Sequence, residues 1–209
     1  MGMIYLIRHA EPQFDNGHGV TRDPEGPRYY GSLDLELSRE GREHAVSLET
    51  SLEHLREGTL ITSSMRRAQH TAELIFPGKP YRVEPSFREI DLGKWEGRTF
   101  QEVKEEDRMA FEERWSHLET FRSPGGESFQ DLRQRVIPAF RSLIGENLSS
   151  PLVITAHGGV FLVILQEILG IPLQTTFSLR QDYCGIHVLE NGKKDSLTIR
   201  QLNWHPGIL

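Results

Sequence analysis

Cysteine is almost absent from this chain of 209 residues, which has only one, Cys184. A single thiol cannot form an intrachain disulfide, so a disulfide-stabilised scaffold is excluded. Zinc sites built from several thiolates are excluded for the same reason. The remaining composition, with 37% hydrophobic and 26% charged residues, is that of an ordinary globular protein. A chain of this length can bury a sizeable core without disulfides.

Net positive charge is also lacking, because 24 lysines and arginines stand against 30 aspartates and glutamates, for a formal net charge of −6. The overall field of such a chain does not attract nucleic acid or an anionic lipid surface. We therefore expect no nucleic-acid partner. Any anion that the protein binds must be held by a few local cations.

Long hydrophobic runs are missing as well. The N-terminal apolar stretch, residues 3–7, is interrupted at Arg8. A membrane-spanning helix needs about 20 apolar residues, and the apolar core of a signal peptide needs at least about seven. We expect no membrane segment and no export signal, and hence a cytoplasmic protein.

Common motifs for cofactors and metals are absent from the sequence. It contains no Walker A loop, no Gly-x-Gly-x-x-Gly, no His-Glu-x-x-His and no Gly-x-Ser-x-Gly. Its nine histidines are scattered, and no cluster of acidic residues suits Mg²⁺. We expect neither a metal nor a cofactor.

Short apolar runs alternate with helix-like segments along the chain. Residues 3–7, 60–62 and 152–155 are predicted to be buried strands. Helices are predicted after Ser38, with Ala45, Leu48, Leu52 and Leu55 on the apolar face; after Ser63 or Ser64; over 127–148, bent at Pro138; and over 160–169. Two β-rich runs, 185–190 and 196–202, flank Asn191-Gly192 and predict a hairpin.

This alternation predicts an α/β fold, a three-layer sandwich with a mainly parallel central sheet, helices on both faces and a small helical cap. We expect one domain over residues 1–209. Residues 94–126 are dense in charge with few apolar anchors, so we expect them to form a cap insertion outside the main core. Residues 12–32 contain seven glycines and prolines, which predict a long surface loop.

The residues directly after the predicted strands are the main candidates for a functional site. In such folds, ligands bind beyond the carboxyl ends of the strands. The segments at these positions are Arg8-His9, Ser63 to Arg67, and His157-Gly158-Gly159. Two histidines and three arginines are therefore expected at one edge of the sheet.

Each of these side chains also has a purely structural explanation. A lone histidine at a strand end, such as His9, is more often solvated or satisfied within the core than functional. Arg66 and Arg67 oppose the macrodipole in a first helical turn, and a bound anion would resolve that conflict. For Arg66 we prefer extension into solvent. His157 is equally well explained as a helix N-cap.

Glu89 lies between the predicted core and the predicted cap. A carboxyl under a lid can act as a proton donor. Taken alone, Glu89 is better explained as a surface acid, and composition does not select it over Asp91 or Glu96.

Five groups of residues, in register over residues 3–165, resemble motifs of the histidine phosphatase superfamily in its phosphoglycerate-mutase-like branch. The groups are Leu6-Ile7-Arg8-His9-Ala10-Glu11; Gly31-Ser32-Leu33-Asp34 with Leu37-Ser38 and Gly41; Ser64-Met65-Arg66-Arg67-Ala68 with Thr71-Ala72; Glu89 with Gly93-Lys94-Trp95-Glu96-Gly97; and Pro124-Gly125-Gly126-Glu127-Ser128 with His157-Gly158.

The resemblance implies a metal-independent phosphatase. His9 would be the nucleophile and form a phosphohistidine, with its other ring nitrogen held by a backbone carbonyl. Arg8, Arg67 and His157 would bind the phosphoryl oxygens and neutralise charge in the transition state. Glu89 would protonate the leaving oxygen and then accept a proton from water.

The sequence departs from the family pattern at two positions. Ala10 stands where glycine is usual, which raises the question of how closely the loop approaches the phosphoryl group. The family often has asparagine six residues after the nucleophile, where this chain has Asp15 followed by Asn16. Because a carboxylate repels phosphate, we favour Asn16 as the phosphate-binding residue. Arg28, three residues before Gly31, matches another frequent family position and is a candidate for substrate binding.

We therefore expect a phosphomonoesterase acting on a small phosphorylated metabolite, as a monomer or homodimer. One alternative is a cofactor-dependent phosphoglycerate mutase, although the basic, proline-rich segment of mutases is missing. Another is a protein phosphatase or a non-catalytic phosphate-binding module. The short cap and residues 181–185 resemble the α-ribazole-phosphate phosphatase subgroup, which implies α-ribazole 5′-phosphate as a substrate.

Overall fold

The computed structural model describes residues 2–14, 26–146, 150–192 and 196–206. At its centre is a six-stranded sheet in the order β3-β2-β4-β1-β5-β6. Its strands are β1 (Gly2–Arg8), β2 (Thr59–Ser63), β3 (Arg82–Glu84), β4 (Leu152–Ala156), β5 (Ile186–Asn191) and β6 (Leu197–Trp204). The first four pair in parallel, and β5 and β6 pair antiparallel at one edge. The predicted α/β fold with a mainly parallel sheet is confirmed.

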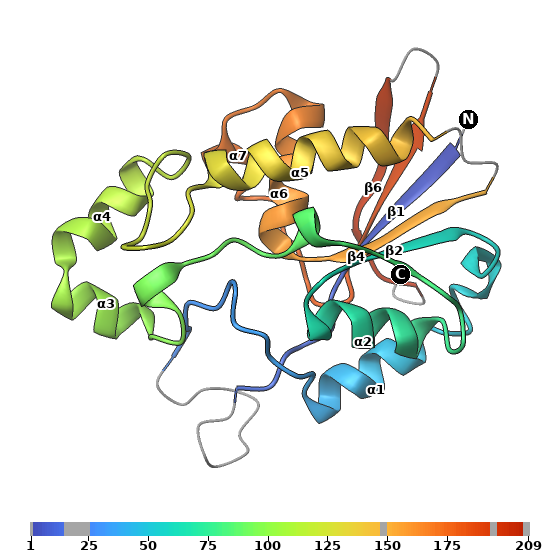
Figure 1. Cartoon of the computed structure of the whole chain (residues 1–209), viewed down its shortest axis with the longest axis horizontal. Coiled ribbons are helices and arrows are strands. Elements are labelled where there is room, and N and C mark those ends of the chain that lie inside the picture. Colours follow the sequence, from blue (N-terminus) through green and yellow to red (C-terminus); the bar gives the residue numbers. More distant parts are fainter. Residues whose placement is uncertain (1, 15–25, 147–149, 193–195, 207–209) are drawn as a thin grey trace.

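Helices cover both faces of the sheet (Figure 1). On one face lie α1 (Arg39–Ser47) and α2 (Arg66–Ile75), and on the other α5 (Phe129–Ile144) and α6 (Gly158–Leu169). Successive side chains of a strand point to opposite faces. In β1, Leu6 joins the apolar cluster under α5 and α6, while Ile7 joins the cluster under α1 and α2. Both faces of the central strands are therefore buried, as expected for parallel strands.

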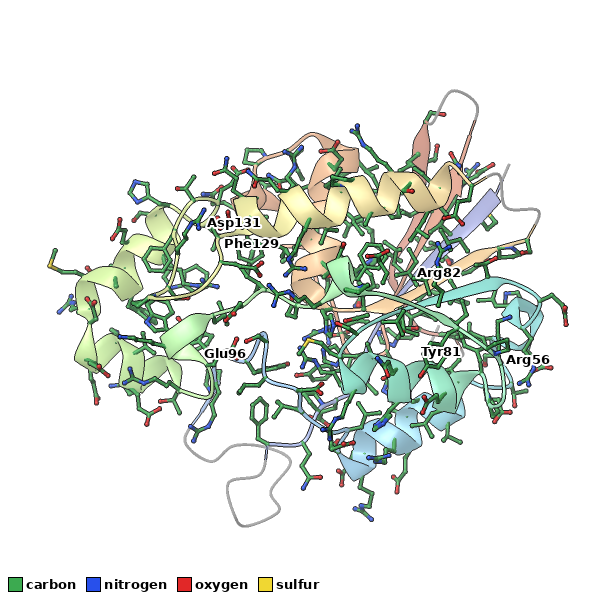
Figure 2. All side chains as sticks on the ribbon, in the orientation of Figure 1. Arg56, Tyr81, Arg82, Glu96, Phe129 and Asp131 are labelled. Atoms are coloured by element: carbon green, nitrogen blue, oxygen red, sulfur yellow. The ribbon has the colours of Figure 1, made fainter. Side chains whose placement is uncertain are left out.

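The segment 94–126 contains α3 (Phe100–Glu106) and α4 (Arg108–Ser116), which lie beyond one end of the sheet in Figure 1. A capping box between Thr99 and Glu102 begins α3, and the side chain of Asp107 caps α4. The carboxyl ends of the parallel strands point toward this end of the molecule (Figure 1). Figure 2 marks the two ends: Phe129 begins α5 on the α3–α4 side, while Tyr81 lies on the opposite side.

The remaining short elements are α7 (Leu173–Thr176) and three 3₁₀ turns, η1 (Glu53–Leu55), η2 (Pro85–Phe87) and η3 (Gly93–Trp95). Among the helices of the described ranges, none combines the length and the apolar character that crossing a membrane requires.

Some local predictions were wrong. The helix after Ser38 ends at Ser47, and although Leu52 and Leu55 are buried as predicted, they lie in the following turns. Residue 65, not Ser63 or Ser64, is the N-cap of α2; the backbone N–H of Arg66 donates instead to Asp34 Oδ1, at 2.8 Å. Asp34, from a distant part of the sequence, thus accepts the N–H at the start of α2 that we expected a local serine to cap.

Two further elements differ from the sequence prediction. Strand β3 was not predicted, because it is three residues long and mostly exposed, so it lacks an apolar pattern. Helix α5 begins after Ser128, whose capping box with Asp131 fixes the first turn, and it continues through Pro138 to Ile144.

Candidate active site

Three residues that follow three different strands meet at the carboxyl edge of the sheet. Nε of Arg67 donates to Nε2 of His9 across 3.3 Å, and the ring centroids of His9 and His157 are 5.1 Å apart. All three side chains are almost fully buried. The rule that ligand-binding residues follow parallel strands therefore locates this cluster correctly from the sequence.

The hydrogen bonds of His9 define its tautomer. Nδ1 lies 2.7 Å from the carbonyl oxygen of Ala10, and Nε2 accepts the N–H of Arg67. The network therefore assigns the ring proton to Nδ1 and leaves a lone pair on Nε2. Burial, and then the charges of Arg67 and Arg8, hold the pKa of His9 well below its usual value. A neutral imidazole whose Nε2 carries a lone pair and no proton is a nucleophile at neutral pH.

Arg67 is fixed by backbone carbonyls rather than by carboxylates. Its Nη1 donates to the carbonyl of Leu33 at 2.5 Å, and its Nη2 donates to that of Gly31 at 2.7 Å. A Cβ at residue 31 would stand 1.8 Å from the carbonyl oxygen of Ile90, so only glycine brings this loop so close. The guanidinium keeps its full charge for an anion.

Arg8 has a similar environment. Its Nη1 donates to the carbonyl of Gln181, its Nη2 lies 3.5 Å from the Tyr30 hydroxyl, and its guanidinium carbon lies 4.4 Å from the ring centroid of Tyr183. Its Nε is buried and has no hydrogen-bond partner in the described part of the chain. Two guanidinium groups that have no carboxylate partner in the described part of the chain, beside a neutral imidazole, form a site for a multiply charged anion.

His157 occupies the N-cap position of α6, but its side chain makes no capping hydrogen bond. Its Nε2 lies 2.8 Å from Oγ of Ser63, and its Nδ1 is buried without a partner among the described residues. Burial, followed by the neighbouring Arg67, His9 and Arg8, holds the pKa of His157 well below its usual value. The ring therefore belongs to the cluster at the strand ends, and the N-cap explanation fails.

Glu89 is buried, with 9% of its surface exposed, so its explanation as a surface acid is wrong. Its Oε2 accepts the backbone N–H of Gly159 and its Oε1 that of Ile90, both at 2.9 Å. A Cβ at residue 159 would stand 2.4 Å from Oε1 of Glu89. Glycine at the start of α6 thus makes room for this carboxylate.

A cavity of about 400 Å³ connects the cluster to the α3–α4 end of the molecule. Arg8, His9 and Glu89 line one part of it. Most of the remaining wall is aromatic or aliphatic, formed by residues that include Tyr29, Tyr30, Leu92, Phe100, Trp115, Phe129 and Phe177. A phosphate ester with its phosphorus near His9 can place the rest of the molecule against this wall.

Comparison with known proteins agrees with this geometry. The model of the histidine phosphatase superfamily (branch 1) matches residues 4–205. The chain belongs to this superfamily. It is a histidine phosphatase of the phosphomonoesterase type, in a family whose mechanism is typically metal-independent.

Individual relatives differ in their substrates. The chain is 32% identical over 167 residues to glucosyl-3-phosphoglycerate phosphatase of Mycolicibacterium vanbaalenii, covering 75% of this chain and 73% of that protein. It is 28% identical over 205 residues to the adenosylcobalamin/α-ribazole phosphatase of Escherichia coli, covering 96% and 95%. The crystal structure of the α-ribazole phosphatase from Shigella flexneri superimposes with a TM-score of 0.80 at 25% identity, covering 97% and 96%.

The other predicted site residues of this histidine phosphatase occupy different environments. Arg66 is exposed and pairs with Asp34 and Glu36, in line with the preferred solvent-facing explanation. Arg28 lines the cavity, and its Nη1 donates to the carbonyl of Gly97 at 2.9 Å. Asp15 and Asn16 lie outside the described residues.

Ala10 is fully buried in the histidine phosphatase, and its backbone N–H donates to Oγ1 of Thr71 at 2.9 Å. The other two acids near Glu89 bind backbone groups. Asp91 accepts from the N–H of Gly93, and Glu96 accepts from the N–H groups of Gly31, Ser32 and Leu92.

Sequence reasoning missed two contacts of the histidine pair. Ser63 was part of the strand-end segment Ser63 to Arg67, but the only role we gave it was that of a possible helix cap. The ring centroid of Tyr183 lies 5.6 Å from that of His9, and its hydroxyl bonds that of Tyr30. Nothing in the local pattern around Tyr183 signals this contact, because residue 183 is in an irregular segment before β5.

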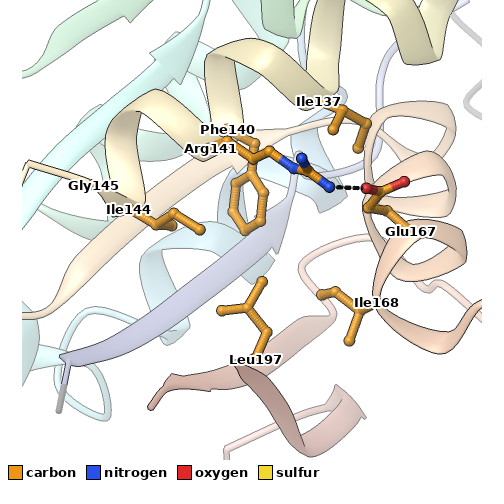
Figure 3. Close-up of a pocket in the computed structure, with 8 residues that line it drawn as sticks. All are labelled: Ile137, Phe140, Arg141, Ile144, Gly145, Glu167, Ile168 and Leu197. Carbon is orange, nitrogen blue, oxygen red and sulfur yellow. Dashed lines mark hydrogen bonds and ion pairs between the residues drawn. The ribbon is translucent and has the colours of Figure 1, made fainter. Parts of the chain in front are cut away.

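A second cavity, of about 430 Å³, lies between α5, α6 and β6 (Figure 3). Apolar side chains such as Ile137, Phe140 and Leu197 line it, and an ion pair between Arg141 and Glu167 joins α5 to α6 at its edge (Figure 3). It includes none of the residues of the histidine cluster. Nowhere in the described ranges do three or more His, Cys, Asp or Glu side chains gather to hold a metal ion.

Proposed function

We propose that this histidine phosphatase hydrolyses a small phosphomonoester through a phosphohistidine at His9. The observation that carries the proposal is the neutral, buried imidazole of His9. Its Nε2 lone pair lies beside two guanidinium groups that form no ion pair with a carboxylate of the described ranges. An uncharged nucleophile next to concentrated positive charge suits attack on a phosphate dianion.

In the first step of the proposed reaction, Nε2 of His9 attacks phosphorus and the bond to the leaving oxygen breaks. The electron pair of that bond goes to the leaving oxygen, which takes a proton from Glu89. In the second step, water attacks the phosphohistidine, its proton passes to Glu89, and the P–N bond breaks. Alcohol and inorganic phosphate are released, and both residues return to their starting states.

Arg8, Arg67 and His157 bind the phosphoryl oxygens in this proposal. Charge spreads over those oxygens as the bonds break, so fixed donors around them lower the barrier. Asn16 is a further proposed phosphate ligand, and Arg28 a proposed substrate-binding residue. Positive charge from the arginines serves where other phosphotransfer enzymes use Mg²⁺.

We place residues 94–126 as a cap on a single domain of residues 1–209. The cavity that holds His9 is also lined by Phe100 and Trp115 from that segment, which supports this division. A cap over the leaving group excludes water from the reacting phosphoryl group and sets which leaving groups fit.

Two classes of leaving group fit the cavity in different ways. The flat, apolar base of α-ribazole 5′-phosphate suits the aromatic wall. An acidic leaving group, as in glucosyl-3-phosphoglycerate, suits the arginines that line the same cavity. Relatives named for each of these substrates are about equally similar to the chain.

The test is a phosphate-release assay over both substrates, 3-phosphoglycerate and p-nitrophenyl phosphate, with His9→Ala and the exposed-histidine control His117→Ala. We expect hydrolysis that persists in EDTA, is lost in His9→Ala and is kept in His117→Ala. Isomerisation of 3-phosphoglycerate faster than its hydrolysis would identify a mutase instead. Turnover of phosphoproteins alone would identify a protein phosphatase, and full activity in His9→Ala a non-catalytic role for the site.

A further inference from the structure

Arg114 on α4 is a buried cation that has no counter-ion among the described residues. Only 7% of its surface is exposed, and its Nε is buried with no hydrogen-bond partner in the described chain. No carboxylate among the described residues forms an ion pair with it, whereas Arg108 on the same helix is exposed and pairs with Glu112. Burying an unpaired charge is costly, so such an arginine calls for a physical explanation.

The surroundings of Arg114 compensate its charge only in part. Its guanidinium carbon lies 5.5 Å from the ring centroid of Tyr29 and 5.9 Å from that of Trp95. Aromatic faces attract a cation but supply no hydrogen-bond acceptor in the plane of the guanidinium. The N–H groups of Arg114 therefore keep most of their capacity to bind an anion.

A second unsatisfied donor lies beside Arg114. Only 3% of the surface of Tyr29 is exposed, and its buried hydroxyl has no hydrogen-bond partner among the described residues. Two adjacent, buried polar groups without partners are rare in a folded protein, because each loses its hydrogen bonds to water. One acceptor group bound between them would satisfy both.

Both residues line the same cavity as His9 and Glu89. The phosphoryl group at His9 already has Arg8, Arg67 and His157 around it. Arg114 belongs to α4, which lies beyond the end of the sheet (Figure 1). Its side chain therefore lines the part of the cavity where the leaving group of a substrate bound at His9 would lie.

We propose that Arg114 and the Tyr29 hydroxyl bind a carboxylate on the leaving group, which makes phosphomonoesters of hydroxy acids the preferred substrates. This inference rests on the proposed phosphatase function. One guanidinium balances the single charge of a carboxylate and can bind it with two parallel N–H bonds. A second phosphate dianion would leave a negative charge uncompensated between aromatic rings.

The direct test compares two substrates that differ only in this group. 3-Phosphoglycerate carries a carboxylate where glycerol 3-phosphate carries a hydroxymethyl group. We expect the wild-type protein to hydrolyse 3-phosphoglycerate with a kcat/KM about 10- to 100-fold higher, the range for a hydrogen-bonded charged group. Arg114→Met should remove this preference, so that kcat/KM for 3-phosphoglycerate falls to that for glycerol 3-phosphate.

Two further variants sharpen the assignment. Tyr29→Phe keeps the ring and removes only the hydroxyl, so it should lower the preference by less than Arg114→Met does. Arg108→Met removes the same charge from an exposed position of α4 and should leave the preference unchanged. Binding of 3-phosphoglycerate to His9→Ala, measured by calorimetry, should weaken about 10-fold or more when Arg114→Met is added.

The competing explanation is that Arg114 holds the α3–α4 segment in place through Tyr29 and Trp95. In that case Arg114→Met would lower the melting temperature and reduce activity on both substrates alike, which would overturn the proposal. We expect an unchanged or higher melting temperature, because an unpaired buried charge is removed.

Equal wild-type rates on the two substrates, or a preference for a bisphosphate such as fructose 1,6-bisphosphate over 3-phosphoglycerate, would also overturn the proposal that Arg114 binds a carboxylate. If wild type hydrolyses neither these esters nor p-nitrophenyl phosphate, the phosphatase proposal itself fails.

Discussion

Nε of Arg67 and Nε2 of His9 lie 3.3 Å apart, and the arginine is the donor. The nitrogen that we propose as the nucleophile is therefore already oriented by a group that we also propose to bind the incoming phosphoryl oxygens. This contact requires the ring proton to be on Nδ1, where the carbonyl of Ala10 accepts it. One guanidinium thus keeps the nucleophile unprotonated and supplies positive charge at the reacting centre.

Substitutions at two neighbouring glycines test whether the reaction depends on the position of the Glu89 side chain. A Cβ at residue 159 would overlap Oε1 of Glu89 at 2.4 Å, whereas a Cβ at residue 158 would have its closest contact with Arg8 Nε at an ordinary 3.6 Å. We predict that Gly159→Ala lowers kcat by about 100-fold, because a catalytic group shifted by about 1 Å loses that much. Gly158→Ala, the matched control, should stay within about threefold of wild type.

Steady-state kinetics on p-nitrophenyl phosphate, with thermal melting to show that both variants fold, measures the difference. Equal activity in the two variants would mean that the position of the Glu89 carboxylate does not matter to the reaction.

Substitutions of the neighbouring residues Arg67 and Arg66 give a second comparison between a test variant and its control. Arg67 is fully buried and holds three acceptors at once, which a lysine ammonium on a single stem cannot do in the same geometry. Arg67→Lys should therefore lower kcat/KM by about 100-fold or more, the scale seen when one transition-state donor is removed. Arg66→Lys alters only exposed ion pairs and should change kcat/KM by less than about twofold. Similar small effects in both variants would contradict the role proposed for Arg67.

The sequence predicted those parts of the fold and site that depend on local pattern. The apolar runs located β1, β2 and β4, and the strand-end rule then selected His9, Arg67 and His157, because parallel strands deliver their next residues to one edge. Glu89 was different. From local pattern alone it was a surface acid, and only the resemblance to a family singled it out, since its burial depends on Gly159 from a segment 70 residues away.

Contacts between distant segments were not predictable from the sequence. The partners of Arg114 come from residues 29 and 95, and the pairing of Tyr183 with Tyr30 joins positions 153 residues apart. The hydrophobic periodicity of a single helix or strand carries no information about contacts between residues so far apart in the sequence. The high density of charged residues in 94–126 predicted an exposed segment, so the burial of Arg114 within it was not expected.

Burial of His187 predicts how the stability of the protein depends on pH. Desolvation lowers the pKa of this side chain, which is 1% exposed, from its ordinary 6.5 to about 4. Between these two values the unfolded chain binds a proton that the folded chain does not, so stability falls as the pH drops from 6.5 to 4. The expected loss from this residue is about 3 kcal/mol.

Urea unfolding of wild type and His187→Gln at pH 7 and pH 4 isolates this contribution, because the packing cost of the substitution is the same at both pH values. Wild type should lose about 3 kcal/mol more than the variant on acidification. Parallel losses in the two proteins would show that His187 titrates normally in the folded state.

The measurement that tests the central claim most directly is trapping of the phosphoenzyme during turnover of a ³²P-labelled phosphomonoester. We predict a label on His9 that survives alkali, is lost in acid, and is absent from His9→Ala, because a phosphorus–nitrogen bond hydrolyses when its nitrogen is protonated. A label on another residue, or steady hydrolysis by His9→Ala, would contradict the account.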